Sequence, residues 1–192
     1  MLILGYLVGL TGALAPGPTL VAAINASVRE GWTAGPKVTL GHMAVEIVMV
    51  GVIAAGLAVV LAGYSAVVAG VGGIALVTFG LLTLNGARSA GIDTPSGDAP
   101  TAAPVLAGFL TSIGNPYFWI WWLTAGCAFL LQSLAGGMIL AVAFMIGHWG
   151  ADVSWYSFVS TGVAKGKAIL PDTTYHRIMA ACGIFLILFG LY

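Results

Sequence analysis

The sequence predicts an all-α integral membrane protein with six transmembrane helices, arranged as two inverted three-helix repeats with broken first and fourth helices. The 192 residues are 60 % hydrophobic and 6 % charged, whereas soluble domains carry roughly 25 % charged residues. The apolar residues form six long runs, and one pattern with a histidine and an acid recurs in the second run of each half. So little charge cannot cover a water-exposed surface, so we expect the chain in a lipid bilayer.

The charge balance and the cysteines exclude other classes. Six Lys and Arg offset six Asp and Glu, so nucleic-acid binding has no electrostatic footprint. Cys127 and Cys182 lie far apart in apolar runs without a C-x-x-C pattern, so a thiol relay or a metal knuckle has no support. No cofactor is predicted, and no G-x-x-x-x-G-K-S/T pattern indicates ATP binding.

A helix needs about 20 apolar residues to cross the hydrocarbon. Cutting the chain at its charged and turn-rich stretches gives six expected spans: Leu2–Val28, Val38–Ala62, Tyr64–Ala87, Pro104–Leu131, Gly136–Thr161 and Thr174–Tyr192. Ala13-Leu14-Ala15 is similar to a signal-peptide cleavage site. No Lys or Arg precedes it and the apolar run continues to Val28, so we expect a retained first span.

The basic residues predict the orientation. They fall in or beside the first, third and fifth loops: Arg29, Lys37, Arg88, Lys165, Lys167 and Arg177. The other two loops and both termini contain none. Because cytoplasmic loops carry the excess of Lys and Arg, we expect both termini outside and the basic loops in the cytoplasm of a prokaryotic cell.

The stretch 88–103 is rich in Pro, Gly, Ser and Asp and is typical of a flexible linker. It divides the chain into a first three-helix repeat, 1–87, a cytoplasmic linker, 88–103, and a second three-helix repeat, 104–192. A duplicated unit of three spans enters the membrane in opposite senses, so the repeat is inverted.

Helix breakers lie near the middle of the first and fourth spans: Pro16, Gly17, Pro18, Asn115 and Pro116. Proline removes a backbone donor and clashes with the preceding turn. The freed backbone groups must be satisfied by protein or by a water-filled cavity. Broken helices at matching positions of two halves indicate a substrate site, and we expect these residues to shape it. The alternative is a pair of simple kinks.

The repeated pattern is Gly-His-x-x-x-acid, in Gly41-His42-Met43-Ala44-Val45-Glu46 and Gly147-His148-Trp149-Gly150-Ala151-Asp152. Side chains four apart share a helix face. Charged groups inside a span are costly and mark functional paths. At ~1.5 Å of rise per residue, the two acids come out about 12 and about 14 Å from the cytoplasmic ends of their spans. The same rise places the histidines about 14 Å apart.

Three roles suit His42, Glu46, His148 and Asp152. The acids could load and release a proton in a site of low polarity. They could hold a cationic substrate, or the four residues could bind a divalent transition metal. The expected separation of the histidines argues against one shared ion. The remaining interpretation is two pairs that only neutralise each other within their own helices.

Aromatic residues concentrate after Pro116 and around Asp152. The first cluster begins near mid-span, away from the interface where Trp and Tyr usually gather. The candidate pocket aromatics are Trp119, Trp122, Trp149, Trp155 and Tyr156. Ordinary packing or lipid contact is the alternative.

The glycine and proline pattern resembles the N-terminal signature of the LysE-type amino-acid exporters. The matching residues are Gly5, Gly12, Ala15-Pro16-Gly17-Pro18, Ser27, Gly31, Gly35 and Gly41. Asn115-Pro116 followed by Trp119 resembles that family's fourth-span motif. The resemblance covers the full length and implies export of amino acids or similar small solutes, driven by a proton or ion gradient. Many amino-acid exporters of the family lack a His–acid pair in the second span, so the histidines are a departure.

We therefore expect a secondary transporter and not an enzyme, with a small-molecule substrate, a proton or cation as coupling ion in an antiport, and a homodimer left open. Glu46 and Asp152 would couple the ion, and His42 and His148 would tune them or relay protons. The first rival is an exporter of divalent metal ions. A membrane enzyme would need Ser112, Ser154 or Tyr156 beside His148, and a structural module would leave the charged pairs unexplained.

Overall fold

The computed structural model describes residues 1–15, 17–56, 103–167 and 172–191, with isolated helical positions between 70 and 85. Its helices are α1 (Leu2–Ala13), α2 (Pro18–Glu30), α3 (Ala34–Ala54), α6 (Ala103–Ile113), α7 (Pro116–Trp121), α8 (Cys127–Ala135), α9 (Met138–Lys167) and α10 (Asp172–Leu191). A 3₁₀ turn, η1 (Gly31–Thr33), joins α2 to α3, and a π-helical segment, η2 (Trp122–Gly126), joins α7 to α8. The all-α prediction is confirmed for these residues, which contain no strand. Most of the predicted third span, and the linker up to residue 102, lie outside them.

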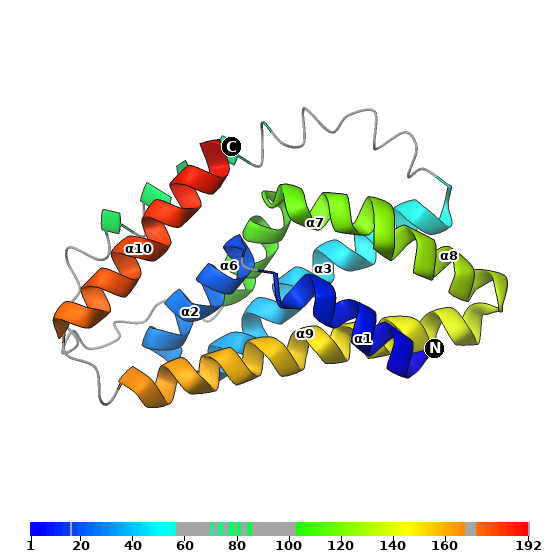
Figure 1. Ribbon diagram of the computed structural model, residues 1–192, viewed down its shortest axis with the longest axis horizontal. Coiled ribbons are helices and arrows are strands. Elements are labelled where there is room, and N and C mark those ends of the chain that lie inside the picture. The colour runs from blue at the N-terminus through cyan, green and yellow to red at the C-terminus, as the bar shows by residue number, and fades with distance from the viewer. Residues whose placement is uncertain are drawn as a thin grey trace.

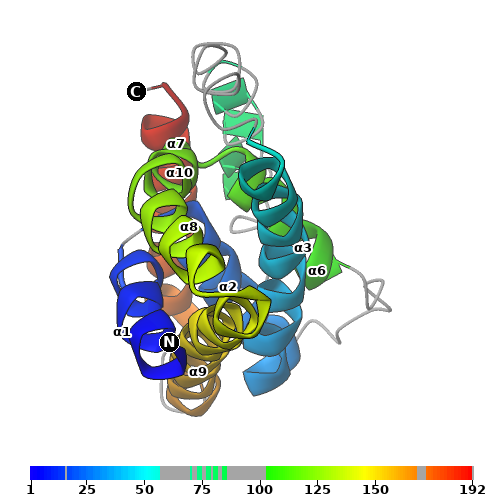
Figure 2. The ribbon, with the colours of Figure 1, turned by 90° about the vertical axis from the view of Figure 1, so that its right-hand side faces the viewer.

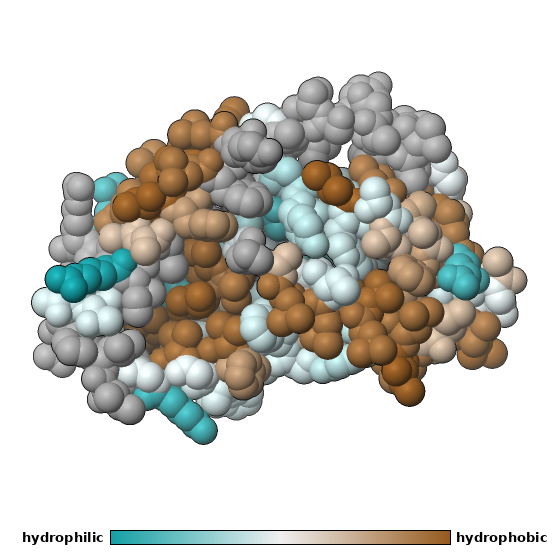
Figure 3. Space-filling view, in the orientation of Figure 1, coloured by the Kyte–Doolittle hydropathy of each residue, from teal (hydrophilic) through white to brown (hydrophobic). Residues whose placement is uncertain are grey.

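The helices expose many large apolar side chains, while several ionisable side chains are buried. Three stretches are long and apolar enough to cross a membrane: Pro18–Ala54, Pro116–Ala135 and Met138–Gly166. On α3, Leu40 and Ile47 are 58 % and 57 % exposed, whereas Glu46 is 1 % exposed. Apolar atoms cover much of the face in Figure 3, and most of its strongly hydrophilic atoms lie toward the left-hand and right-hand ends. Large exposed apolar surfaces suit a lipid environment, and the chain is an integral membrane protein.

Two helix breaks occur where the sequence predicts them. Between α1 and α2 the chain is extended at Gly17, and Pro18 begins α2. Proline suits this position because the first turn of a helix needs no donor from it. Of the other residues predicted to shape this break, Pro16 lies outside the described residues.

The second break lies between α6 and α7. Asn115 is extended, its side-chain oxygen accepts a 3.0 Å hydrogen bond from the Tyr117 N–H, and Pro116 begins α7. A Cβ on Gly17 would stand 3.3 Å from the Asn115 side-chain nitrogen. The two breaks are therefore neighbours in space, although they lie far apart in the sequence.

Helices from the two halves run in opposite directions. In Figure 1, α1 and α2 run from right to left while α7 and α8 run from left to right. Likewise α3 runs from left to right and α9 from right to left. α1 packs along α9, α6 packs along α3, and α3 and α9 contact each other; Figure 2 shows α1 beside α9 and α6 beside α3 from a second side. α10 packs against α2.

Glycines allow α1 and α9 to touch through their backbones. A Cβ on Gly5 would collide with the carbonyl oxygen of Phe144, and one on Gly147 would collide with the carbonyl oxygen of Leu2. Small residues at helix crossings are typical of membrane bundles, where close backbone approach gives the packing energy.

The crossing of α3 and α6 has the same construction. A Cβ on Gly41 would collide with the carbonyl oxygen of Val105, and one on Gly108 would collide with that of Val38. Gly41 and Gly147 are the first residues of the two Gly-His-x-x-x-acid patterns. The glycine of each pattern therefore fixes a helix crossing one residue before the histidine.

Two predicted loops are shorter than expected. The first loop is reduced to η1, because α2 continues to Glu30 and α3 begins at Ala34. Gly31, with a φ of 73°, makes the turn between them. α9 continues to Lys167, past the predicted end of its span at Thr161. The span was predicted to end before the basic loop. Lysines near the end of a helix interact favourably with the helix dipole, so the helix can continue into these basic residues.

Candidate functional site

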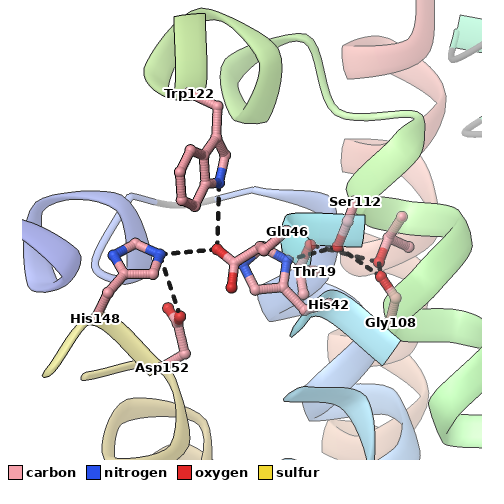
Figure 4. A network of polar contacts seen from close by, with 9 residues as sticks. Thr19, His42, Glu46, Gly108, Ser112, Trp122, His148 and Asp152 are labelled. Atoms are coloured by element: carbon pink, nitrogen blue, oxygen red, sulfur yellow. Dashed lines mark hydrogen bonds and ion pairs between the residues drawn. The ribbon is translucent and has the colours of Figure 1, made fainter. Parts of the chain in front are cut away.

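Glu46 on α3 is the centre of a buried polar cluster (Figure 4). One of its carboxylate oxygens, Oε1, lies 2.8 Å from His148 Nε2 and 3.2 Å from His42 Nε2. Trp122 Nε1–H donates to the same oxygen over 3.2 Å. A buried carboxylate is tolerated only when it is paired and hydrogen-bonded, and nitrogens from α3, α9 and the α7–α8 region supply this.

Asp152 joins the cluster through His148. Its Oδ2 lies 3.6 Å from His148 Nε2, longer than the 2.8 Å contact between His148 and Glu46. The second histidine is therefore closer to the acid of the first half than to the acid four residues along its own helix. The interpretation of two separate pairs that neutralise each other only within their helices is wrong.

The expected separation of about 14 Å between the histidines is also wrong. Nε2 of His42 and Nε2 of His148 contact the same Glu46 oxygen. The expected distance was measured along each span from its predicted end, as if the helices were parallel. In the structure α9 continues beyond its predicted end, and α3 and α9 contact each other. All four residues consequently belong to one cluster.

Aromatic rings enclose His148. The Trp121 ring stacks on it with centroids 5.0 Å apart, and the Trp122 ring meets it edge-on at 5.2 Å. These consecutive tryptophans both reach the cluster where α7 passes into the π-helical segment η2. A Cβ on Gly126 would stand 2.7 Å from the Trp122 ring and 2.8 Å from the Trp121 ring. Gly126 thus leaves the room that both indoles occupy.

His42 is held in place by Ser112, a residue of α6. Its Nδ1 lies 2.6 Å from Ser112 Oγ, and the Ser112 hydroxyl also donates to the Gly108 carbonyl over 2.6 Å. Ser112 is fully buried. Sequence reasoning considered Ser112 only as a nucleophile beside His148, because the crossing of α3 and α6 cannot be read from local spacing.

A cavity opens between the helix breaks and the cluster, with about 450 Å³ of empty space including its mouth. The described residues that line it are Gly12, Ala13, Ala15, Gly17, Thr19, Leu20, His42, Glu46, Asn115, Tyr117, Phe118, Trp121, Trp122, His148, Asp152 and Tyr156. It is lined by the four residues of the cluster and by Gly17 and Asn115 from the two breaks.

Some predicted residues lie elsewhere. The described lining does not include Pro18 or Pro116, which begin helices beside the cavity, nor Trp119, Trp149 or Trp155. Trp119 Nε1–H donates to the Ile113 carbonyl over 2.7 Å and so satisfies a backbone carbonyl at the end of α6.

Trp121 and Thr19 line the cavity but were not predicted. Trp121 stood in the predicted aromatic cluster beside Trp122. A helical period of 3.6 residues does not place neighbours on one face, so only the local π-helical geometry could reveal both indoles at the cluster. Thr19 had no signal beyond its position after the Pro-Gly-Pro element.

Two buried carboxylate oxygens lack a hydrogen-bond partner among the described residues, Glu46 Oε2 and Asp152 Oδ2. Ligand atoms of His42, Glu46 and Asp152 all lie within 4.8 Å of one another. Carboxylate oxygens with free lone pairs beside an imidazole can accept a proton or coordinate a cation. The cluster therefore has the chemistry of an ion site in the lining of a cavity.

The chain matches a family model described as LysE type translocator over residues 10–192. No curated protein and no solved structure matches it. The match covers nearly the whole chain and agrees with the apolar helical bundle described above. The chain therefore belongs to the LysE type translocator family, whose members are membrane transporters of small solutes.

Proposed function

We propose that the protein is a secondary exporter of amino acids or similar small solutes, coupled to a proton or ion gradient. The observation that carries this proposal is the Glu46 cluster, a set of buried ionisable residues that lines a cavity between two broken helices in an apolar bundle. Ionisable groups inside a membrane mark ion and substrate pathways. In this proposal the cavity takes the solute, and Glu46 and Asp152 take the coupling ion.

The matched glycine crossings support an inverted repeat of two three-helix units. In all four collisions the carbonyl belongs to the residue three positions before the partner glycine. α1 therefore contacts α9 as α6 contacts α3, and the equivalent helices run in opposite directions (Figure 1). Alternating access in such transporters is largely the movement of one repeat against the other around a fixed site. The unit boundaries 1–87 and 104–192 follow from this proposal.

The orientation we propose places both termini outside. Among the described residues, Arg29 lies near the end of α2, Lys37 near the start of α3, Lys165 near the end of α9 and Arg177 near the start of α10. These helix ends lie together on the left of Figure 1, away from the labelled N-terminus. Cytoplasmic loops carry the excess of Lys and Arg, which supports a cytoplasmic location for this end.

The geometry of His42, Glu46 and Asp152 favours a divalent transition-metal ion as a second candidate substrate. Imidazole and carboxylate ligands suit such ions, and these three residues bring their ligand atoms within 4.8 Å. Thermal unfolding of the purified protein with Zn²⁺ or Co²⁺ tests this candidate. Stabilisation that His42→Ala removes would support it, and unchanged unfolding with both metals would exclude it.

An enzymatic role has weaker support. Ser112 contacts His42 and not His148, and its hydroxyl donates to the Gly108 carbonyl. A serine nucleophile instead donates its proton to the base. Ser154 is exposed, with its hydroxyl 3.0 Å from Tyr6 Oη and donating to the Ala151 carbonyl over 2.9 Å. Neither serine is arranged for attack on a substrate.

Counterflow in proteoliposomes tests the proposed export. Vesicles that contain the purified protein are loaded with an unlabelled amino-acid mixture, and the entry of each labelled amino acid is followed. We expect exchange by the wild type and its loss in Glu46→Gln and Asp152→Asn, because both changes remove an ionisable group from the cavity. Glu30→Gln is the control, since Glu30 pairs with Lys37 away from the cavity at 2.5 Å. Wild-type exchange by both cavity variants would contradict the roles of the two acids.

A further inference from the structure

The Ser112 hydroxyl has one hydrogen and two close partners. Its oxygen lies 2.6 Å from the Gly108 carbonyl oxygen and 2.6 Å from His42 Nδ1. A carbonyl oxygen can only accept a hydrogen bond, so the hydroxyl hydrogen belongs to the Gly108 contact. Serines in membrane helices commonly donate in this way to the carbonyl one turn earlier. His42 Nδ1 must therefore donate to Ser112.

This assignment determines whether the other ring nitrogen of His42, Nε2, carries a hydrogen. A neutral imidazole with a hydrogen on Nδ1 has a bare lone pair on Nε2. His42 Nε2 faces Glu46 Oε1 at 3.2 Å, and an ionised carboxylate also offers only lone pairs. Two acceptors at this distance need a hydrogen between them. His42 and Glu46 therefore hold one proton jointly, on the nitrogen or on the oxygen.

The second histidine has a different neighbour. Gly9 follows the crossing glycine Gly5 by four residues, as Ser112 follows the crossing glycine Gly108 by four. Gly9 thus occupies, beside His148, the place that Ser112 occupies beside the first histidine. A Cβ on Gly9 would stand 2.8 Å from His148 Nδ1, so no serine fits there. His148 Nδ1 is buried and has no hydrogen-bond partner among the described residues.

We propose that Ser112 is a positioning residue that makes the two histidines unequal. It fixes the Nδ1–H tautomer of His42, which holds a proton together with Glu46. Gly9 leaves His148 Nδ1 without such a partner among the described residues, so the 2.8 Å contact with Glu46 Oε1 places the hydrogen of a neutral His148 on Nε2. This inference rests on the proposed function only for the role of this difference between the histidines in transport.

Nitrogen-15 NMR of histidine-labelled protein in liposomes tests the assignment directly. The chain has three histidines, and single His→Asn variants assign their signals. We expect His42 Nδ1 to be protonated in the wild type. Ser112→Ala removes the acceptor and shifts the His42 signals, and Ser112→Thr, which keeps a hydroxyl, restores them. Thr111→Ala is the control, because the neighbouring Thr111 hydroxyl bonds the Ala107 carbonyl on its own helix and does not contact a histidine. A wild-type His42 with a bare Nδ1 would overturn the proposal.

Transport separates this inference from the proposed function. We expect Ser112→Ala to lower the stimulation of exchange by a pH gradient by roughly tenfold, the effect of losing one hydrogen bond to the ion-binding pair. Ser112→Thr retains it. If the wild type exchanges no amino acid, the proposed function fails while the NMR result still decides the tautomer. If Ser112→Ala keeps full stimulation with shifted His42 signals, the positioning role fails while the exporter remains.

Discussion

Glu46 concentrates its contacts on a single oxygen. Two imidazole nitrogens and one indole N–H lie within 3.2 Å of Oε1, whereas Oε2 has no hydrogen-bond partner among the described residues. An ion or proton that binds to Oε2 would therefore compete with no existing bond. This division explains how one carboxylate can hold the two halves together and still offer a binding position.

Replacing Trp122 with Phe tests the contribution of the indole donor. Trp122→Phe keeps the ring against His148 but removes the N–H that bonds Glu46. Interhelical hydrogen bonds in membranes contribute about 0.6 to 2 kcal/mol, so we expect a stability loss of that size and a severalfold slower exchange. Thermal unfolding and counterflow measure the two effects.

Trp119→Phe is the matched control for this change. Its indole N–H bonds the Ile113 carbonyl at the end of α6 and not the cluster. It should lose comparable stability but keep wild-type exchange. Equal exchange rates in Trp122→Phe and Trp119→Phe would show that the bond to Glu46 has no role in transport.

At the scale of elements, the two glycine crossings set the position of the cluster. Gly41 and Gly147 bring their helices into backbone contact one residue before His42 and His148. Carbonyl oxygens of a partner helix cannot move aside as a flexible side chain can. Any side chain at these glycines must therefore separate whole helices, and this movement would displace the histidines as well.

Gly147→Ala tests the α1–α9 crossing. The new methyl group would meet the Leu2 carbonyl and the Tyr6 backbone nitrogen, and overpacking of this kind costs about 1 to 3 kcal/mol. We expect lower thermal stability and weaker exchange. Gly162→Ala on the same helix is the control, since its Cβ would enter open space, and Ala in place of Gly stabilises a helix by about 0.5 to 1 kcal/mol. Equal stability of the two variants would contradict the close crossing.

At the scale of the whole molecule, the basic residues that the structure describes are gathered at one end of the bundle. The basic residues that flank α2, α3, α9 and α10 lie at the same end, whereas the turn between α8 and α9 contains none. Moving basic groups across a bilayer is costly. We therefore propose for the assembled bundle the same orientation that the separate loops predict.

Cysteine labelling in intact cells tests this orientation. After replacement of Cys127 and Cys182 by Ala, single cysteines are placed at Lys165 and Gly136, both of which are exposed. A maleimide that cannot cross the membrane should label Gly136→Cys from outside and label Lys165→Cys only after permeabilisation. The reverse pattern would place the termini in the cytoplasm.

The sequence by itself predicted the membrane class, the all-α fold of the described residues, both helix breaks and the four ionisable residues of the cluster. Composition and local spacing determine these features, because a helix face and a proline break depend on neighbours within a few residues. The family followed from the same local patterns, in particular Pro16-Gly17-Pro18 and Asn115-Pro116.

Only the tertiary structure decided how these residues meet. Local spacing paired each histidine with the acid four residues away, whereas the crossing of α3 with α9 brings His148 to Glu46. Ser112 reaches His42, and Gly9 faces His148, through helix crossings between segments 70 and 139 residues apart in the chain. Such contacts depend on the positions of glycines on two helices at once, and a periodicity read along one helix contains no information about its partner.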